Sequence, residues 1–191
     1  MIIETANPAD LDYLLAARRE AAAWLSARGI DQWSRDYPAD KLLATIEDGV
    51  VFMLRDGTET AGTITLTPEA EDGLWTDAEL AEPARYINKL TVSRSYAGQD
   101  LGGRLLNWAG ERAARDGAEW LRLDAWTTNE RLHRYYLDHG FSYVRTVREG
   151  GAVNGGPRVS GWLAQRVAAP AEHGFTDQTM ADADALSDIT S

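Results

Sequence analysis

Apolar residues in the N-terminal half of the chain follow strand spacing first and helix spacing next. The run MIIET is a short apolar segment, and apolar side chains then recur every three or four positions from Leu11 to Leu25, before Gly29. Asn7-Pro8 places a capping side chain and a proline where that helix would begin. The elements expected here are a strand at 1–5, a helix ending near Gly29, a shorter helix at 41–47, and two strands around the Asp56-Gly57 turn.

The C-terminal half alternates between the same two spacings after an acidic connection at 68–84. In WLRLDAW, Leu121, Leu123 and Ala125 share one face, which is typical of a strand, and Gly140 ends a helix-like stretch. The elements expected in this half are strands at 85–92, 120–126, 141–147 and 159–167 and helices at 102–115 and 129–138.

This order of elements predicts a single α/β (α+β) domain at 1–167. We expect a mixed, mostly antiparallel central sheet of six to seven strands flanked by about four helices, with the site at strand ends where helices begin. Residues 168–191 have no periodic apolar face and carry several acidic residues. They are predicted to form an acidic C-terminal tail that is flexible and need not fold with the core.

Composition and charge narrow the possible functions. The chain has 191 residues and no cysteine, which excludes disulfides, thiolate metal sites and a cysteine nucleophile. A formal net charge of −11 argues against nucleic acid as a partner. The acidity suits a cationic substrate, and it suits plain solubility equally well. We see no export signal and no run of about 18 apolar residues, so we expect a cytoplasmic protein with no membrane partner.

A glycine-rich turn separates a strand from a helix near the middle of the chain. The segment RSYAGQDLGGRLL holds Gly98, Gly102 and Gly103 where an apolar run ends and a helix begins. That layout suits a loop whose backbone N–H groups face an anion such as a phosphate. Asp100 lies within the same turn, and a carboxylate is a poor neighbour for a phosphate.

Two segments, in order, carry a resemblance to a known family. LTVSRSYAGQDLGGRLLNWA, followed by LRLDAWTTNERLHRYYLDHGF, resembles the GNAT superfamily of N-acetyltransferases. In that family a strand of the L-x-V type ends in R-G-x-G-x-G/A, and a second motif reads N-x-x-A-x-x-x-Y-x-x-x-G-F. The resemblance extends over roughly residues 2–167. It implies a GNAT-like enzyme that takes acetyl-coenzyme A as acyl donor and binds its pyrophosphate at the first motif.

The first motif departs from the family pattern at two positions. Ala97 stands where the family has Arg, and Asp100 stands where it has its middle Gly. The backbone amides and the helix dipole remain available to the pyrophosphate, and Asp100 is equally well explained as a helix-capping acid. The residues that the resemblance implies for acetyl-coenzyme A binding are Leu90, Thr91, Val92, Gly98, Gln99, Asp100, Leu101, Gly102, Gly103, Arg104 and Asn129.

Tyr136 occupies the tyrosine position of the second motif, with Leu132 in place of its alanine. The family position implies that Tyr136 lies near the departing sulfur, where a phenol with a pKa of about 10 can protonate a thiolate or stabilise its charge. The alternative is an aromatic side chain packed in the core. Asn88 stands near the position where many members carry Glu, so Asp124 and Glu82 are the candidate general bases, and loss of the proton to water is the alternative.

The resemblance implies an acceptor pocket among the first helices, the acidic connection and the last hairpin. The candidate substrate-binding residues are Trp33, Tyr37, Trp75 and Asn88. Aromatic walls favour an apolar or aromatic amine, whereas the acidic connection favours a cation. The spacing of the three histidines is not that of a metal site, and no metal is expected.

We therefore predict an acyl-coenzyme A-dependent N-acyltransferase, with acetyl-coenzyme A as donor, that acylates an amine of a small molecule by direct attack. We expect a monomer or a homodimer. Three alternatives stay open: an inactive module that binds acyl-coenzyme A, a relative that uses a long acyl thioester or an aminoacyl-tRNA, and acetylation of a protein amino terminus or lysine.

Overall fold

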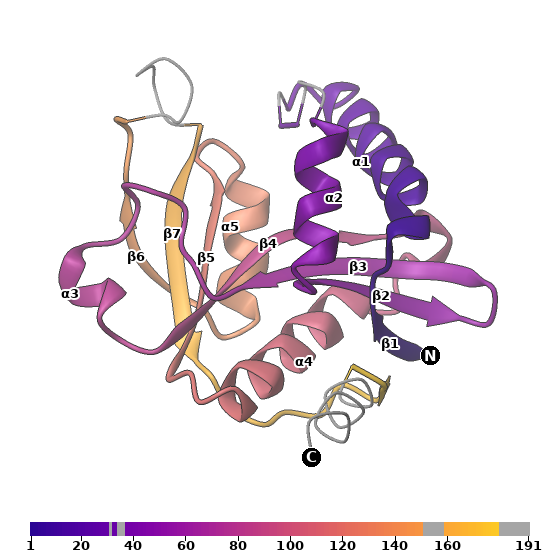
Figure 1. The fold of residues 1–191 in the computed structure, drawn as a ribbon. Helices are drawn as coiled ribbons and strands as arrows, with labels where there is room; N and C mark the ends of the chain where they lie inside the picture. Colours follow the sequence, from indigo (N-terminus) through magenta and orange to yellow (C-terminus); the bar gives the residue numbers. More distant parts are fainter. Residues whose placement is uncertain (31, 34–36, 151–158, 180–191) are drawn as a thin grey trace. The chain divides into compact units, whose positions relative to one another are not determined.

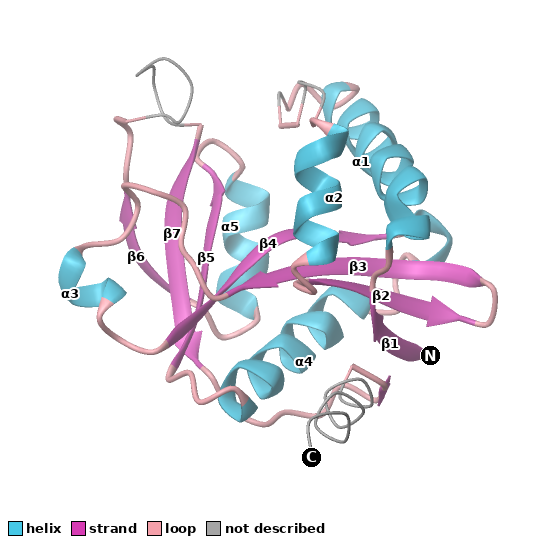
Figure 2. Ribbon diagram, in the orientation of Figure 1, coloured by secondary structure: helices cyan, strands magenta, loops and turns pink. Residues whose placement is uncertain are grey.

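The computed structural model describes residues 1–30, 32–33, 37–150 and 159–179 (Figure 1). Its strands are β1 (Ile2–Thr5), β2 (Val51–Asp56), β3 (Glu59–Thr67), β4 (Ala84–Val92), β5 (Trp120–Trp126), β6 (Ser142–Thr146), β7 (Ser160–Val167) and β8 (Thr176–Asp177). Its helices are α1 (Leu11–Ser26), α2 (Ala39–Glu47), α3 (Asp77–Leu80), α4 (Leu101–Arg115) and α5 (Glu130–Asp138), with 3-10 turns η1 (Pro8–Asp10) and η2 (Arg94–Tyr96). Figure 2 shows how helices and strands alternate along the chain.

The α/β class and the mixed sheet predicted from the sequence are confirmed. Neighbouring strands follow the order β6-β7-β5-β4-β3-β2-β1-β8. The pairs β4–β5 and β1–β8 are parallel, whereas β1–β2, β2–β3, β5–β7 and β6–β7 are antiparallel. Within the described residues the sheet has eight strands, where six to seven were expected, because the sequence pattern did not predict β8. The short helix α3 was also not predicted, although Thr76 and Glu79 form its capping box.

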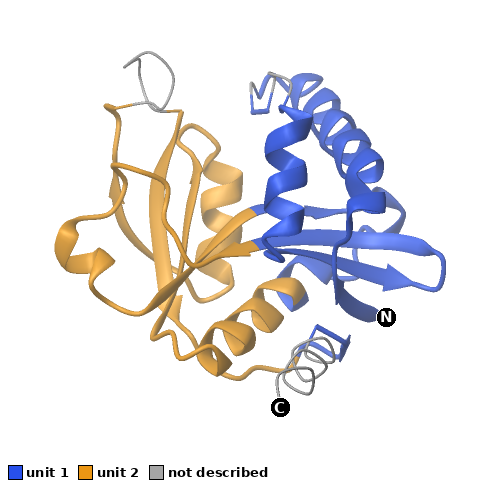
Figure 3. Ribbon diagram, viewed as in Figure 1, with its two compact units in different colours: residues 1–65, 89–104, 173–191 blue, residues 66–88, 105–172 orange. Residues whose placement is uncertain are grey.

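The chain divides into two compact units (Figure 3). Unit 1 comprises residues 1–65, 89–104 and 173–191, and unit 2 comprises residues 66–88 and 105–172.

In unit 1, helices α1 and α2 pack against each other and against β2. Their apolar sides form a core in which Leu14, Leu42 and Met53 are buried. Asn7 caps the turn at the start of this region as predicted, because its side chain accepts a hydrogen bond from the backbone N–H of Ala9 at 3.0 Å. The capped element is η1, which leads directly into α1.

In unit 2, the alternating pattern of β5 places its two faces in different surroundings. Leu121, Leu123 and Ala125 are buried together on one face, as the sequence predicted. Arg122 points to the other face and is also fully buried. Its guanidinium forms an ion pair with the Glu82 carboxylate and donates a hydrogen bond to the Gln165 side chain at 3.0 Å. A buried charge needs such partners, because burial removes its hydration.

The described part of the C-terminal segment differs from the expected flexible tail. Strand β8 pairs in parallel with β1, in the register of Ile2 with Thr176 and Ile3 with Asp177. Phe175 is only 8% exposed, and its ring contacts the guanidinium of Arg104. The sequence did not predict these contacts, because one aromatic residue, Phe175, and the two-residue strand β8 form no periodic apolar face. Residues 180–191 lie outside the described residues.

Candidate active site

The glycine-rich turn of unit 1 presents backbone amides at the start of α4. Gly98 has a φ of +84°, a left-handed conformation that glycine adopts without a steric penalty. The first hydrogen bond within the helix runs from the N–H of Arg104 to the carbonyl of Asp100 at 3.1 Å. The amides of Leu101, Gly102 and Gly103 precede that bond, at the helix end that carries the positive end of the dipole. This geometry fits a phosphate-bearing ligand.

Asp100 adopts a left-handed backbone conformation inside this turn, with a φ of 50°. A helix-capping residue ordinarily has an extended backbone, so the position of Asp100 resembles that of a glycine more than that of a cap. A non-glycine side chain costs about 1 kcal/mol in this region, although Asp tolerates it better than most. This backbone conformation fits the glycine that the family has at this position, because glycine adopts it without a steric penalty.

Arg104 is the cation at the start of α4. Its guanidinium donates hydrogen bonds to the carbonyl oxygens of His173 at 2.7 Å and Gly174 at 3.2 Å. These contacts hold the C-terminal segment of unit 1. Gln99, another predicted donor-binding residue of the turn, donates its backbone N–H to the carbonyl of Tyr96 at 3.3 Å.

A pocket lies in unit 1, and two of its lining residues come from β4, the strand that leads to this turn. Its apolar part consists of buried side chains from α1, α2 and β2, and its polar part comes from β3 and β4. Its lining residues are Leu14, Ala17, Arg18, Trp33, Tyr37, Leu42, Val51, Thr63, Thr65, Lys89 and Thr91. Trp33, Tyr37 and Thr91, which the sequence predicted as site residues, therefore meet in one pocket.

Two cations contact the aromatic residues of the pocket. The Lys89 Nζ donates a hydrogen bond to the Tyr37 hydroxyl at 3.0 Å and lies 4.2 Å from the centre of the Tyr37 ring. The Arg18 guanidinium carbon lies 5.1 Å from the Tyr37 ring centre and 5.4 Å from that of Trp33. Both distances are within the range of cation–π attraction. The Thr91 hydroxyl shares a 2.6 Å hydrogen bond with that of Thr63.

Sequence reasoning missed Arg18 and Lys89 as pocket residues. The sequence contains no clear signal for Lys89, because β4 also contains the polar residues Arg85, Asn88 and Thr91. Arg18 lies at helical spacing from Leu14 on α1, so the helix carries it to the same side as a core residue.

In unit 2, the second motif forms the start and the body of α5. The Asn129 side chain caps the helix by accepting a hydrogen bond from the N–H of Leu132 at 3.1 Å. Tyr136 is 8% exposed, and its ring packs edge-on against Tyr135 and Phe141 at 5.8 and 5.7 Å between ring centres. Burial raises the pKa of Tyr136, and the negative charge of Asp124 raises it further. The phenol therefore stays protonated near neutral pH.

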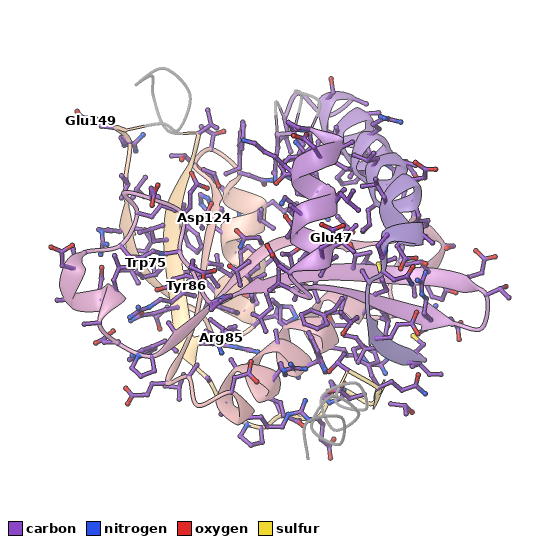
Figure 4. All side chains as sticks on the ribbon, in the orientation of Figure 1. Glu47, Trp75, Arg85, Tyr86, Asp124 and Glu149 are labelled. Atoms are coloured by element: carbon purple, nitrogen blue, oxygen red, sulfur yellow. The ribbon has the colours of Figure 1, made fainter. Side chains whose placement is uncertain are left out.

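Asp124 and Asn88, two further predicted site residues, also belong to unit 2. The Asp124 carboxylate accepts a hydrogen bond from the Ser160 hydroxyl across the β5–β7 pair. The Asn88 amide donates to the Thr67 hydroxyl at 3.1 Å. Figure 4 shows Asp124 among the side chains of this unit.

Trp75 lies in the core of unit 2 and does not belong to the eleven residues that line the pocket of unit 1. Its ring packs edge-on against Tyr86 at 6.0 Å, and the guanidinium carbons of Arg122 and Arg145 lie 4.7 and 5.8 Å from its ring centre (Figure 4). Trp33 and Tyr37 belong to unit 1, so their predicted grouping with Trp75 stays a prediction. A sequence cannot distinguish a tryptophan in a pocket wall from one in a core, because both need an apolar neighbourhood.

The acidic connection expected to attract a cation is partly neutralised within unit 2. The Glu79 carboxylate forms an ion pair with Arg145 at 2.6 Å, and Glu82 forms one with Arg122. The hydrogen bonds from Arg145 lower the pKa of Glu79 to about 2. Two of the predicted cation-attracting carboxylates, including the candidate base Glu82, thus bind arginines of the same unit. The last hairpin of the predicted pocket falls largely at 151–158, outside the described residues.

Comparison with known proteins identifies the relatives of this chain. The model of the acetyltransferase (GNAT) family matches residues 18–141, which is more than half of the chain. The N-acetyltransferase YesJ of Bacillus subtilis (strain 168), itself uncharacterized, is 33% identical over 129 residues, covering 64% of this chain and 71% of the relative.

Solved structures share the fold. A GNAT-family acetyltransferase from Listeria monocytogenes superposes with a TM-score of 0.69 at 24% identity, covering 87% of this chain and 94% of that one. The protein yncA from Salmonella typhimurium, which was solved with its cofactor acetyl-CoA, superposes with a TM-score of 0.62 at 18% identity, covering 90% and 96%. Among the described residues, none of the helices is long and apolar enough to cross a membrane.

Proposed function

Because this chain belongs to the GNAT family of acetyltransferases and is an N-acetyltransferase, we propose that it transfers the acetyl group of acetyl-coenzyme A to the amine of a small molecule. The amine nitrogen attacks the thioester carbonyl carbon directly. The new carbon–nitrogen bond forms, the carbon–sulfur bond breaks, and the sulfur leaves as a thiolate. With no cysteine in the chain, no acyl-cysteine intermediate is available.

The pocket of unit 1 is the observation that carries this proposal. Its lining combines apolar, aromatic and hydrogen-bonding side chains, which is the usual composition of a small-molecule pocket. It shares β4 with the candidate donor site: Lys89 and Thr91 line the pocket, and the same strand continues through Val92 toward the glycine-rich turn. An acceptor in the pocket and a donor at the turn would thus be held by the same segment of chain.

The backbone of the turn supports acetyl-coenzyme A as the donor. The amides of Leu101, Gly102 and Gly103 and the dipole of the fifteen-residue α4 favour a pyrophosphate. Gly98 has the positive φ that a tight turn around an anion requires. The Asp100 carboxylate opposes that binding, so we expect a donor affinity below that of a turn with glycine at this position.

Tyr136 is the residue to which we assign stabilisation of the leaving thiolate. Its raised pKa lies above the value of about 8.5 that is usual for a thiol. Complete proton transfer to the sulfur is therefore uphill, and the phenol acts by donating a hydrogen bond to the developing charge. We assign the role of proton acceptor for the amine to Asp124, with water as the alternative acceptor.

Three measurements test the proposed function. Mass spectrometry of protein purified without added ligand would reveal a co-purifying thioester, and calorimetric titration would measure acetyl-coenzyme A binding directly. A panel of small amines assayed for thiol release would then detect transfer. Thiol release that depends on the amine supports the enzyme.

The other outcomes identify the alternatives. Donor binding with no release for any amine would indicate an inactive acyl-coenzyme A-binding module. Thiol release only with a longer acyl thioester would indicate that the natural donor is not acetyl-coenzyme A. Thiol release only with peptide substrates would indicate that the acceptor is a protein and not a small molecule. Absence of any acyl-coenzyme A binding at millimolar concentration would contradict the proposal.

A further inference from the structure

The C-terminal segment at 173–178 is bound to the first turn of α4, the helix that follows the glycine-rich turn. The Arg104 guanidinium donates hydrogen bonds to the carbonyl oxygens of His173 at 2.7 Å and Gly174 at 3.2 Å. Its central carbon also lies 4.6 Å from the centre of the buried Phe175 ring. All four residues belong to unit 1 (Figure 3), so these contacts join the start of α4 to the C-terminal segment within one compact unit.

Close packing fits this part of the chain to the helix. Gly174 has a φ of +67°, and a Cβ atom at this position would lie 2.9 Å from a guanidinium nitrogen of Arg104. Glycine therefore permits both the backbone conformation and the close approach. Further along α4, within unit 2, the Asn107 amide donates a hydrogen bond to the carbonyl of Glu172 at 2.9 Å. Side chains three residues apart lie on one face of a helix, so one face of α4 binds three consecutive carbonyl groups.

The C-terminal segment is also anchored to β1. The backbone N–H of Thr176 donates to the carbonyl of Met1 at 3.1 Å, and that of Gln178 donates to the carbonyl of Ile3 at 2.9 Å. These hydrogen bonds accompany the parallel pairing of β8 with β1. Contacts within unit 1 thus lead from β1 through the C-terminal segment to Arg104 at the start of α4.

The first turn of α4 needs support from its surroundings, because its conformation is not favourable by itself. Asp100, which precedes it, has a left-handed φ of 50°. Such a conformation of a non-glycine residue persists where the surrounding structure holds it. Helix ends also open more readily than helix centres. Arg104 closes this turn through its own N–H, which donates to the Asp100 carbonyl at 3.1 Å, so contacts that hold the Arg104 side chain restrain the turn.

We propose that the C-terminal segment is a positioning element of the donor site: by binding Arg104, it holds the first turn of α4 in the conformation that binds the pyrophosphate of acetyl-coenzyme A. This role rests on the proposed function, since it concerns the same donor site. A turn that is already ordered loses less conformational entropy when the pyrophosphate binds. Coupling between two sites is reciprocal, so a bound donor also favours the docked state of the C-terminal segment by the same factor.

Hydrogen exchange in the parent protein, followed by NMR, tests this coupling without any substitution. The amides of Thr176 and Gln178 exchange when the segment leaves β1, because their hydrogen bonds then break. We expect saturating coenzyme A to slow this exchange by about fivefold or more. Dephospho-coenzyme A, which keeps the pyrophosphate and lacks the nucleoside phosphate, should slow it equally. The control is the amide of Asp48, which ends α2 in the same unit and should exchange at an unchanged rate.

A matched pair of glycine variants connects the coupling to Arg104. In Gly174→Ala the added methyl group meets the guanidinium, so the segment can no longer hold Arg104 as it does in the parent. We expect the Kd for coenzyme A, measured by calorimetry, to rise by about fivefold or more. Gly49→Ala is the control, because Gly49 has a similar φ of +70° and no atom within 4 Å of an added Cβ, and its Kd should be unchanged. Melting curves confirm that each variant is folded.

Several results would overturn the proposed coupling. Bound coenzyme A that leaves the exchange of Thr176 and Gln178 unchanged would do so, as would equal slowing at Asp48. Faster exchange would mean that Arg104 leaves the segment to bind the donor, and an effect lost with bound dephospho-coenzyme A would exclude the pyrophosphate. Equal Kd values for Gly174→Ala and the parent would exclude the contact with Arg104. A protein that binds no coenzyme A would contradict the proposed function itself, whereas binding without coupling would leave that function intact.

Discussion

At the residue scale, Tyr136 combines a core position with a position in the second motif. Tyr136→Phe keeps the ring contacts with Tyr135 and Phe141 and removes only the hydroxyl. We expect turnover to fall by about tenfold to a thousandfold, the range for a lost proton or hydrogen-bond donor, while the Kd for coenzyme A stays within a few-fold. Steady-state kinetics and calorimetry measure the two quantities.

Tyr135→Phe is the matched control, because it removes a hydroxyl from the neighbouring residue of the same helix. Unchanged turnover in Tyr136→Phe would exclude the role at the thiolate. Losses of similar size in turnover and in affinity would indicate a residue that serves packing alone.

Asp100 is the second informative residue, since its charge and its left-handed backbone can be separated. Asp100→Gly removes the carboxylate and also provides the residue that prefers a φ of 50°. Asp100→Asn removes the charge and keeps a side chain that tolerates this conformation. We expect both variants to tighten acetyl-coenzyme A binding by about fivefold, equivalent to about 1 kcal/mol, measured by calorimetry.

Melting curves of the two Asp100 variants distinguish the competing role. If Asp100 acted as a helix cap, Asp100→Asn would keep the stability of the parent, because Asn caps as well as Asp, and Asp100→Gly would lose a few tenths of a kcal/mol, with flat affinity in both. If the variants bound acetyl-coenzyme A more tightly and melted at the temperature of the parent, the Asp100 carboxylate would act by repelling the negatively charged donor.

At the scale of elements, the sequence predicted what depends on near neighbours. Asn7-Pro8 marked a helix start, and the alternation of Leu121, Leu123 and Ala125 identified the buried face of β5, because both signals lie within a few residues. Arg18, Tyr37 and Lys89 come from three separate segments of unit 1, so no local sequence pattern predicts that they meet in one pocket. The left-handed φ of Lys89 is likewise set by the tertiary structure and has no counterpart in residue type.

Helix α3 and its surroundings provide a prediction for pH dependence. Hydrogen bonds from Arg145 lower the pKa of Glu79 to about 2, from an ordinary value near 4.5. A lowered pKa in the folded state means that this ion pair stabilises the protein fully above pH 4.5 and loses its effect as the pH falls toward 2. Glu79→Gln should therefore reduce the free energy of unfolding by about 1–2 kcal/mol at pH 7, allowing for partial solvent exposure.

Urea unfolding at pH 7 and at pH 3 measures this contribution. The difference between parent and Glu79→Gln should shrink at the lower pH, while the exposed Glu119→Gln should match the parent at both. A difference that is the same at pH 7 and pH 3 would assign the effect of Glu79 to its capping of α3 alone.

At the scale of the whole molecule, the C-terminal segment belongs to the folded structure of unit 1. Phe175 is 8% exposed, and Arg104 binds the two carbonyl groups before it. We expect Phe175→Ala to lower the free energy of unfolding by about 2–4 kcal/mol, through lost burial and the cavity left behind. Ending the chain after Val167 should lower the melting temperature by at least several degrees.

Leu137→Ala, at a side chain that is 43% exposed, is the control for Phe175→Ala and should change stability much less. Differential scanning calorimetry compares the variants. If the truncated chain melted at the same temperature as the parent, the segment would be a flexible tail, as the sequence predicted.

The pairing of β8 with β1 has a consequence for synthesis of the chain. Ile2 and Ile3 are synthesised well before their partners Thr176 and Asp177. Until then the outer edge of β1 lacks the partner that it has in the finished protein, and an uncovered β edge is a template for pairing with other chains. The β1–β8 contact thus forms only after the whole intervening chain has been synthesised, and chains that end before Thr176 would carry an edge open to aggregation.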